Sequence, residues 1–122
     1  MSKPVVVVVD DQLFVCETVE TILKDTYEVH KFISGKEAMD YMSGRPVDLV
    51  LLDYDMPNMT GYEVLMAIRA NKFNSKTPVV FLTAETNERM KKEMLERGAS
   101  DYICKPIKSS ELHNSIKKQL SC

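Results

Sequence analysis

The chain has 122 residues, a length typical of one domain with one hydrophobic core. Its 44% hydrophobic and 28% charged residues are those of ordinary globular proteins, and its formal net charge of -2 argues against a nucleic-acid-binding module held by bulk positive charge. No apolar run approaches the roughly 20 residues of a membrane span, and the valines at 5–9 are too few for a signal peptide. The three cysteines show no Cys-x-x-Cys spacing, so we expect unbridged thiols in a reducing cytoplasm and no structural zinc.

The first half of the chain alternates strand-like runs with helical patterns. The continuous β-branched run at 5–9 indicates a strand that is covered on both faces, and therefore a parallel sheet. Apolar residues then recur at roughly helical spacing from Leu13, Phe14 and Cys16 onward, which predicts an amphipathic helix. In order, we predict a strand over 5–9, a helix from 13 to about 24, a strand over 27–32, a helix from 34 to near 44, and a strand over 47–53.

The second half continues the same alternation. Pro57 and Gly61 mark a loop after the third strand, and a closing helix is predicted by Leu112, Ile116 and Leu120 at spacings of four. Gly98 is expected to cap a charged helix. We predict a helix from about 62, a polar loop over 71–76, a strand over 77–83, a helix over 87–97, a strand over 102–104, and the closing helix.

Five strands that alternate with five helices predict an α/β fold, a parallel sheet with helices on both faces. The crevice of such a sheet lies beyond the carboxyl ends of its strands. This rule brings together Asp10 and Asp11 after the first strand, Asp53 at the end of the third, Thr83 at the end of the fourth, and Lys105 after the fifth.

Three aspartates at one sheet edge would repel one another and raise each other's pKa, and a hard divalent cation such as Mg²⁺ would remove that penalty. Each residue also has a simpler interpretation: Asp10 and Asp11 as helix caps, Thr83 as a strand residue, and Lys105 as a surface cation. Taken together they favour phosphoryl transfer, with a carboxylate nucleophile and with a metal and a lysine that neutralise charge.

The ordered set of motifs resembles the receiver domain of two-component response regulators, over essentially the whole chain, residues 1–122. The matching stretches are the valines with Asp10-Asp11, the run from Asp53 to Gly61, Thr83-Ala84, and Tyr102 followed by Lys105-Pro106. The resemblance implies a doubly wound, flavodoxin-like sheet in the order 2-1-3-4-5.

The resemblance also implies a role for each matching residue. Asp53 is then the phosphoacceptor, and Mg²⁺ is held directly by Asp11, Asp53 and the backbone carbonyl of Asp55, with Asp10 acting mainly through water. The further implied roles are a switch hydroxyl for Thr83, a phosphate-sensing cation for Lys105, an aromatic that changes rotamer for Tyr102, a small residue that keeps the site open for Ala84, and a cis peptide before Pro106.

The function implied is a cytoplasmic signalling switch that takes a phosphoryl group from a histidine kinase or phosphotransfer protein and then binds a downstream protein. The chain would catalyse only its own phosphorylation and dephosphorylation, without membrane or nucleic-acid contact, as a monomer or weak dimer. The output face would be formed by the fourth helix, fifth strand and fifth helix, where Lys91, Lys92 and Lys108 offer positive charge. Asp55 and Glu85 would flank the attacking water and change the phosphoryl lifetime.

Two alternatives have support in the sequence. Leu51-Leu52-Asp53-Tyr54-Asp55 resembles the Asp-x-Asp strand end of haloacid-dehalogenase-type phosphatases, although Asp10-Asp11 precede it here, whereas in that family the acidic pair follows. A receiver-like module that works unphosphorylated is the second alternative; a missing acid or lysine would have favoured it, and none is missing. The domain is expected to be either a stand-alone receiver or part of a larger regulator.

Overall fold

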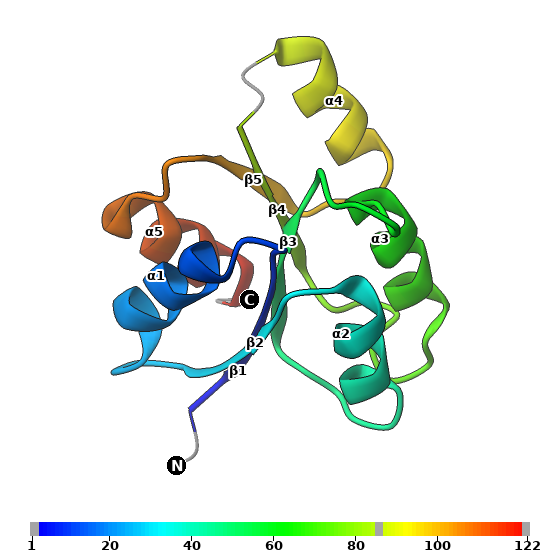
Figure 1. Ribbon diagram of the computed structural model, residues 1–122, viewed down its shortest axis with the longest axis horizontal. Helices are drawn as coiled ribbons and strands as arrows, with labels where there is room; N and C mark the ends of the chain where they lie inside the picture. Colours follow the sequence, from blue (N-terminus) through cyan, green and yellow to red (C-terminus); the bar gives the residue numbers. More distant parts are fainter. Residues whose placement is uncertain (1–2, 85–86, 121–122) are drawn as a thin grey trace.

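Strands and helices alternate along the described residues, 3–84 and 87–120, of the computed structural model (Figure 1). The elements are β1 (Val5–Val9), α1 (Leu13–Leu23), β2 (Glu28–Phe32), α2 (Gly35–Met42), β3 (Leu49–Asp53), α3 (Gly61–Ala70), β4 (Val79–Thr83), α4 (Glu88–Glu96), β5 (Asp101–Cys104) and α5 (Ser109–Leu120).

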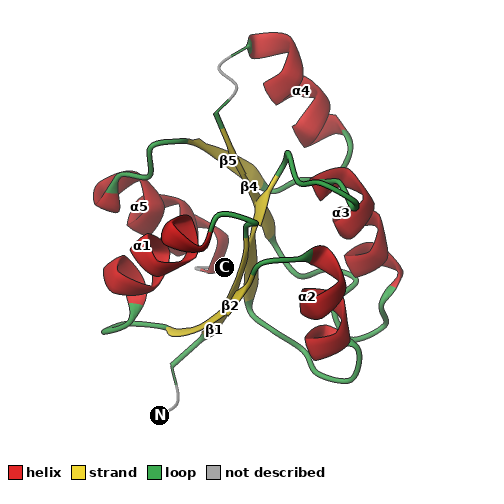
Figure 2. Ribbon diagram, viewed as in Figure 1, coloured by secondary structure: helices red, strands yellow, loops and turns green. Residues whose placement is uncertain are grey.

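The strands form one parallel sheet in the order β2-β1-β3-β4-β5, which confirms the predicted flavodoxin-like winding. Helices α1 and α5 cover one face, and α2, α3 and α4 lie on the other (Figure 2). None of the described helices is both long and apolar enough to cross a membrane.

A core lies on each face of the sheet, which explains the unbroken valine run of β1. Val7 and Val9 pack toward the α2–α3–α4 side, whereas Val6 and Val8 pack toward α1 and α5. Because successive strand residues point to opposite faces, a strand buried on both sides needs an apolar residue at every position. The buried strands β1, β3 and β4 therefore form a rigid platform, and their carboxyl ends carry the polar residues.

Strands β3 and β4 each begin two residues later than the sequence predicted, because a buried side chain takes the place of the sheet ladder there. Asn74 lies in the predicted polar loop but is only 1% exposed. Its Oδ1 accepts from the Val47 backbone N–H at 2.9 Å and from the Thr77 hydroxyl at 3.0 Å, and its Nδ2 donates to the carbonyls of Met42 and Arg45. Residues 47 and 77 are thus held by Asn74, and the ladder starts two residues after each.

Two helix ends carry capping signals that can be read in the sequence. The Thr60 hydroxyl accepts from the Glu63 backbone N–H at 3.2 Å, and the Glu63 carboxylate accepts from the Thr60 N–H, so α3 begins with a capping box. Gly98, with φ of 112°, follows the last turn of α4 and confirms the predicted glycine cap.

The apolar residues at the start of α1 do not all face the core. The buried stripe of α1 is Val15, Cys16, Val19 and Leu23, whereas Phe14 is 70% exposed and Leu13 is also exposed. At 100° per residue, Phe14 lies on the opposite side of the helix from Cys16 and Val19. Leu13 and Phe14 belong to α1, as predicted, but their side chains lie outside its buried face.

Candidate functional site

The carboxyl edge of the sheet gathers the polar residues that the sequence singled out. Asp10 directly follows β1, Asp53 is the last residue of β3, Thr83 is the last residue of β4, and Lys105 follows β5. Asp10, Asp53 and Thr83 are almost completely buried, although each carries a polar group. Burying such groups costs free energy unless partners compensate it, so this edge differs from an ordinary solvated loop region.

Three carboxylates form a compact cluster at this edge. One oxygen each of Asp10, Asp11 and Asp53 lies within 4.8 Å of the others. Asp11 is exposed and opens the cluster to solvent, whereas Asp10 and Asp53 form its buried side. The Asp55 side chain is exposed and is not one of the three, and the Asp55 backbone N–H approaches Asp53 Oδ1 at 3.4 Å.

Lys105 supplies a positive charge against the buried side of the cluster. Its Nζ lies 2.8 Å from Asp10 Oδ2 and 3.3 Å from Asp53 Oδ1. Burial opposes the charged ammonium, but the hydrogen bond to Asp10 and the charges of Asp10 and Asp53 raise the pKa of Lys105 above its ordinary value. Lys105 is therefore protonated at neutral pH and offsets part of the negative charge.

One lysine does not neutralise three carboxylates. Burial, followed by the charge of Asp10, raises the pKa of Asp53 to about 7, against the opposing effect of Lys105. The buried Asp10 Oδ2 has the Lys105 ion pair but makes no well-directed hydrogen bond to the residues that the structure describes. The cluster consists of hard carboxylate oxygens, one of which is buried without a well-directed hydrogen bond to the described residues, and it is open to solvent on one side. These properties fit a hard divalent cation such as Mg²⁺.

The loop after β3 holds the Asp53 backbone by close packing against α3. The Gly61 N–H donates to the Tyr54 carbonyl at 3.1 Å, and a Cβ at Gly61 would lie 2.5 Å from the Asp53 carbonyl oxygen. Position 61 therefore requires glycine, because the backbone of β3 lies too close for a side chain. Met56 is buried in the core and Met59 packs against it, as predicted for loop and core packing.

The side chains of Thr83 and Tyr102 lie on the face of the sheet that carries α4. Thr83 follows Phe81 by two residues, and Tyr102 is the register partner of Phe81 on β5. Tyr102 is half-buried and packs against the core of this face. The Lys105 backbone N–H donates to the Thr83 carbonyl at 2.7 Å, and the Lys105–Pro106 peptide is cis, as expected. Ala84 is exposed, and Glu85 lies outside the described residues.

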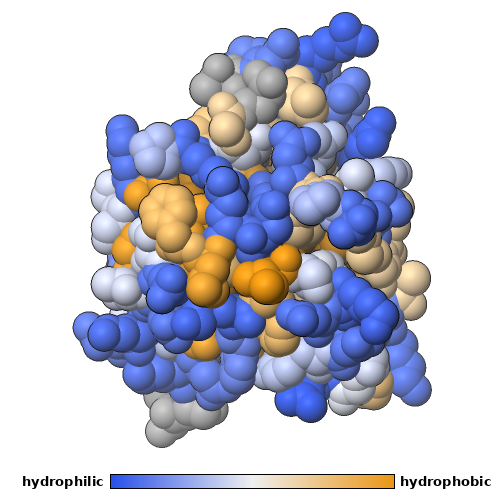
Figure 3. Space-filling view, in the orientation of Figure 1, coloured by the Kyte–Doolittle hydropathy of each residue, from blue (hydrophilic) through white to orange (hydrophobic). Residues whose placement is uncertain are grey.

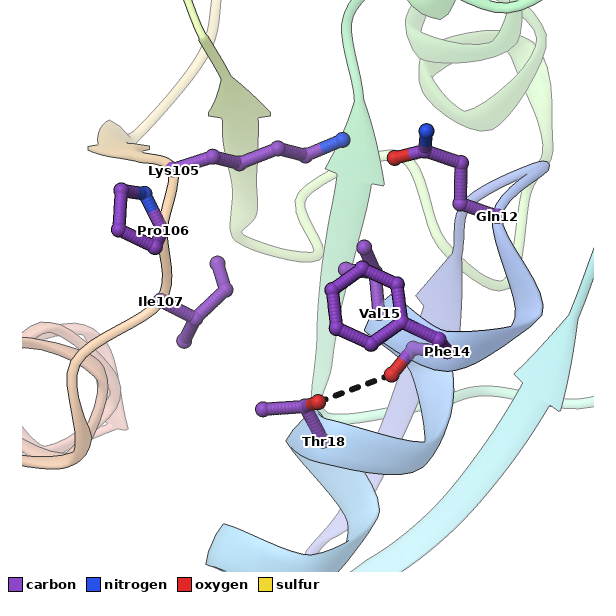
Figure 4. Close-up of a pocket in the computed structure, with 7 residues that line it drawn as sticks. All are labelled: Gln12, Phe14, Val15, Thr18, Lys105, Pro106 and Ile107. Carbon is purple, nitrogen blue, oxygen red and sulfur yellow. Dashed lines mark hydrogen bonds between the residues drawn. The ribbon is translucent and has the colours of Figure 1, made fainter.

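An apolar rim beside the acidic cluster was missed by the sequence analysis. A cavity of about 380 Å³ lies between α1 and the segment after β5. Phe14, Val15 and Thr18 line it from α1, and Pro106 and Ile107 from the other side, with Lys105 and Gln12 pointing toward one another at one end (Figure 4). Figure 3 shows hydrophobic atoms gathered over the amino end of α1, next to polar ones. The sequence signal for this rim is Phe14, an apolar residue that lies outside the buried face of α1.

Comparison with known proteins agrees with this geometry. The family model for the response regulator receiver domain matches residues 6–117. The chain is 32% identical to the rice two-component response regulator ORR11, over 98% of this chain and 82% of that protein. It is 34% identical to a probable cyclic di-GMP phosphodiesterase of Vibrio cholerae, over 99% of this chain but only 28% of that protein.

Solved structures show the same likeness. The chemotaxis protein CheY4 of Vibrio cholerae matches with a TM-score of 0.91 and 31% identity, over 98% of this chain and all of CheY4. The family match decides against the haloacid-dehalogenase alternative. The alternating fold, the strand-end residues and these matches together make the chain a member of the response regulator receiver domain family.

Proposed function

We propose that residues 1–122 act as a phosphorylation-dependent switch, in which Asp53 accepts a phosphoryl group from a phosphohistidine of a histidine kinase or phosphotransfer protein. The observation that carries this proposal is the setting of Asp53: a buried carboxylate at the end of the central strand, 3.3 Å from the Lys105 ammonium and clustered with Asp10 and Asp11. This arrangement supplies a nucleophile and the charges that phosphoryl transfer needs.

In the transfer step, an Asp53 carboxylate oxygen attacks phosphorus. The P–O bond forms as the P–N bond to the donor imidazole breaks, and the departing imidazole takes up a proton. Lys105 balances the charge that reaches the buried side of the site. The pKa of about 7 for Asp53 means that, without a cation, a large fraction of this carboxylate carries a proton at neutral pH and is a poor nucleophile.

Asp11, Asp53 and the backbone carbonyl of Asp55 would hold Mg²⁺ directly, with Asp10 acting mainly through water. When bound, Mg²⁺ supplies charge neutralisation for the carboxylates and for the transferred phosphoryl oxygens. The exposed Asp11 suits this role, because it leaves a water-accessible entry to the cluster. The Asp55 carboxylate is exposed and lies two residues after Asp53, so we propose that it flanks the hydrolytic water and alters the lifetime of the phosphoryl group.

The apolar rim supports a protein as the phosphodonor. The exposed Phe14, with Pro106 and Ile107 across the cavity, places hydrophobic surface directly beside the acidic cluster. An exposed apolar patch bordered by polar residues is typical of a protein interaction site. We also propose a cytoplasmic setting, where the free thiols of Cys16 and Cys104 would stay reduced.

The output step uses Thr83 and Tyr102. A phosphoryl group on Asp53 offers acceptor oxygens to the Thr83 hydroxyl, a charge-assisted contact that draws the end of β4 inward. The space vacated beside Tyr102 lets its ring turn from half-buried to buried, and the surface of α4, β5 and α5 changes for a downstream protein. Lys92 and Lys108 are exposed on this surface, whereas the Lys91 side chain is only 16% exposed.

The test is intact mass after exposure to acetyl phosphate and Mg²⁺. The wild-type chain should gain one phosphoryl unit, and Asp53→Asn should gain none, with Asp48→Asn, an exposed aspartate before the same strand, as the matched control that still labels. Full labelling of Asp53→Asn would show that another residue accepts the phosphoryl group. No labelling of the wild type would favour the receiver-like module that works unphosphorylated.

A further inference from the structure

A lysine of α4 lies over the ring of Tyr102, the aromatic of the proposed output step. The Lys91 ammonium is 5.1 Å from the centre of the Tyr102 ring, within the range of a cation–π interaction. We propose that Lys91 is a positioning residue that holds Tyr102 in its half-buried place and thereby opposes the switch. This inference rests on the proposed function of Asp53, Thr83 and Tyr102.

The surroundings of Lys91 differ from those of an ordinary surface lysine. Its side chain is 16% exposed, whereas its neighbour Lys92 is exposed. Glu88, one turn earlier on α4, lies 3.5 Å from the Lys91 ammonium. Burial disfavours the charged form, but Tyr102, Cys104 and Glu88 raise the pKa of Lys91 above its ordinary value, so the cation over the ring is charged at neutral pH.

The contact matters because α4 has few other attachments to the sheet. Met94 is the only buried residue of this helix in the part of the chain that the structure describes. Near its carboxyl end, Arg69 of α3 donates to the Gly98 carbonyl at 3.2 Å. Toward the amino end, Lys91 over Tyr102 and the partly buried Met90 contribute contacts between α4 and the body of the domain.

The direction of the effect follows from the output step. When Tyr102 turns into the space beside Thr83, its ring leaves the Lys91 ammonium, so the cation–π contact exists in one state only. An interaction present in one state shifts the equilibrium toward that state. Removing the Lys91 charge should therefore raise the population of the turned state in the absence of phosphate.

Beryllofluoride, which mimics the phosphoryl group on Asp53, gives a direct readout. Apparent affinity rises in proportion to the competent population, so Lys91→Met should bind beryllofluoride with Mg²⁺ roughly threefold to tenfold more tightly than wild type. Lys91→Arg keeps a cation over the ring and should stay within about twofold of wild type. Lys92→Met removes a neighbouring exposed charge and is the matched control, with no gain expected.

A second background separates a Tyr102 effect from a general one. In Tyr102→Leu the ring is absent, so adding Lys91→Met should leave the beryllofluoride affinity unchanged. Equal affinity of Lys91→Met and wild type would overturn the proposal. So would the same gain in Lys92→Met or in the Tyr102→Leu background. Urea unfolding of each variant shows that the proteins compared are folded.

The unliganded proteins keep the proposal testable if the function of Asp53 is wrong. Absence of beryllofluoride binding by the wild type would refute the phosphoacceptor assignment. The ring resonances of Tyr102 in unliganded Lys91→Met should still move relative to wild type, and Lys91→Arg should restore much of the original shift. Unchanged ring resonances in Lys91→Met would refute the positioning role itself.

Discussion

At the scale of single residues, the central feature of the candidate site is a carboxylate, Asp53, whose surroundings disfavour its charged form. Asp53 is buried beside Asp10, and both the lost hydration and the neighbouring charge favour its neutral form. The sequence predicted the convergence of these residues from the rule on strand ends. It could not predict how strongly Asp53 is perturbed, because that depends on the depth of burial and on the 3.3 Å distance to Lys105.

The raised pKa of Asp53 makes the stability of the metal-free domain depend on pH. The value is about 7 in the folded chain and 3.8 in an unfolded one, so the folded state keeps a proton that the unfolded state has released. The contribution of Asp53 to stability, on the order of 2–4 kcal/mol, should be fully present at and below pH 4, fall as pH rises toward 7, and be lost above it. Urea unfolding in EDTA across this range should show the fall in wild type and a much smaller one in Asp53→Asn. A parallel decline in both proteins would show that other groups cause it.

Magnesium should recover part of this loss, because it relieves the mutual repulsion of Asp10, Asp11 and Asp53. At Mg²⁺ ten times above its Kd, linkage predicts about 1.4 kcal/mol of stabilisation at neutral pH. Asp11→Asn keeps the size of the exposed side chain but removes one charge from the cluster, so its melting temperature should respond much less. Identical shifts in the two proteins would count against Asp11 as a ligand.

At the scale of elements, the sequence predicted every strand and helix but not what positions their ends. Periodicity reports which face of an element is buried, so the alternating fold could be derived from it. The Asn74 network joins residues 27 and 32 positions apart in the chain and has no periodic signature. The capping box does have a sequence signature, Thr60 followed three residues later by Glu63, and could have been predicted. Predicting that Phe14 is exposed would have needed the exact direction of the buried face of α1. The spacing of the apolar residues indicates that direction only roughly.

The Asn74 network should make this polar-looking loop sensitive to substitution. Asn74→Ala removes an acceptor for Val47 and Thr77 and leaves buried polar groups unpaired, at an expected cost of about 2–4 kcal/mol. Ser75→Ala, at the exposed next position, should change the free energy of unfolding by less than about 0.5 kcal/mol. Comparable urea midpoints for the two variants would mean that Asn74 is dispensable.

Gly61 connects the packing of α3 to the chemistry of β3. In Gly61→Ala the new methyl group meets the Asp53 carbonyl oxygen at 2.5 Å and the Tyr54 Cα at 2.8 Å, so the strand end must move, at about 1–3 kcal/mol. Labelling by acetyl phosphate should slow as the Asp53 carboxylate is displaced. Gly44→Ala, where a Cβ meets nothing within 4 Å, is the control for loss of glycine. Wild-type labelling by Gly61→Ala would show that the site tolerates the shift.

At the scale of the whole molecule, the rigid part of the sheet carries the proposed phosphoacceptor site, and a weakly packed helix lies at the proposed output surface. The platform of β1, β3 and β4 is buried on both faces and holds Asp10, Asp53 and Thr83 in fixed relation. Helix α4 projects at one end and has a single buried residue among those described (Figure 1). Weakly packed elements move at low cost, so under the proposed function a small change at Asp53 would act on α4 more easily than on the buried strands.

The central claim is that a phosphoryl group on Asp53 changes the surface of α4, β5 and α5 through Thr83 and Tyr102. It is tested most directly by two crystal structures of the wild-type chain, one unliganded and one with beryllofluoride and Mg²⁺. We expect the Thr83 hydroxyl to turn toward the ligand on Asp53 and the Tyr102 ring to turn inward, away from Lys91. The same rotamers of Thr83 and Tyr102 in both structures, with beryllofluoride bound at Asp53, would contradict this account.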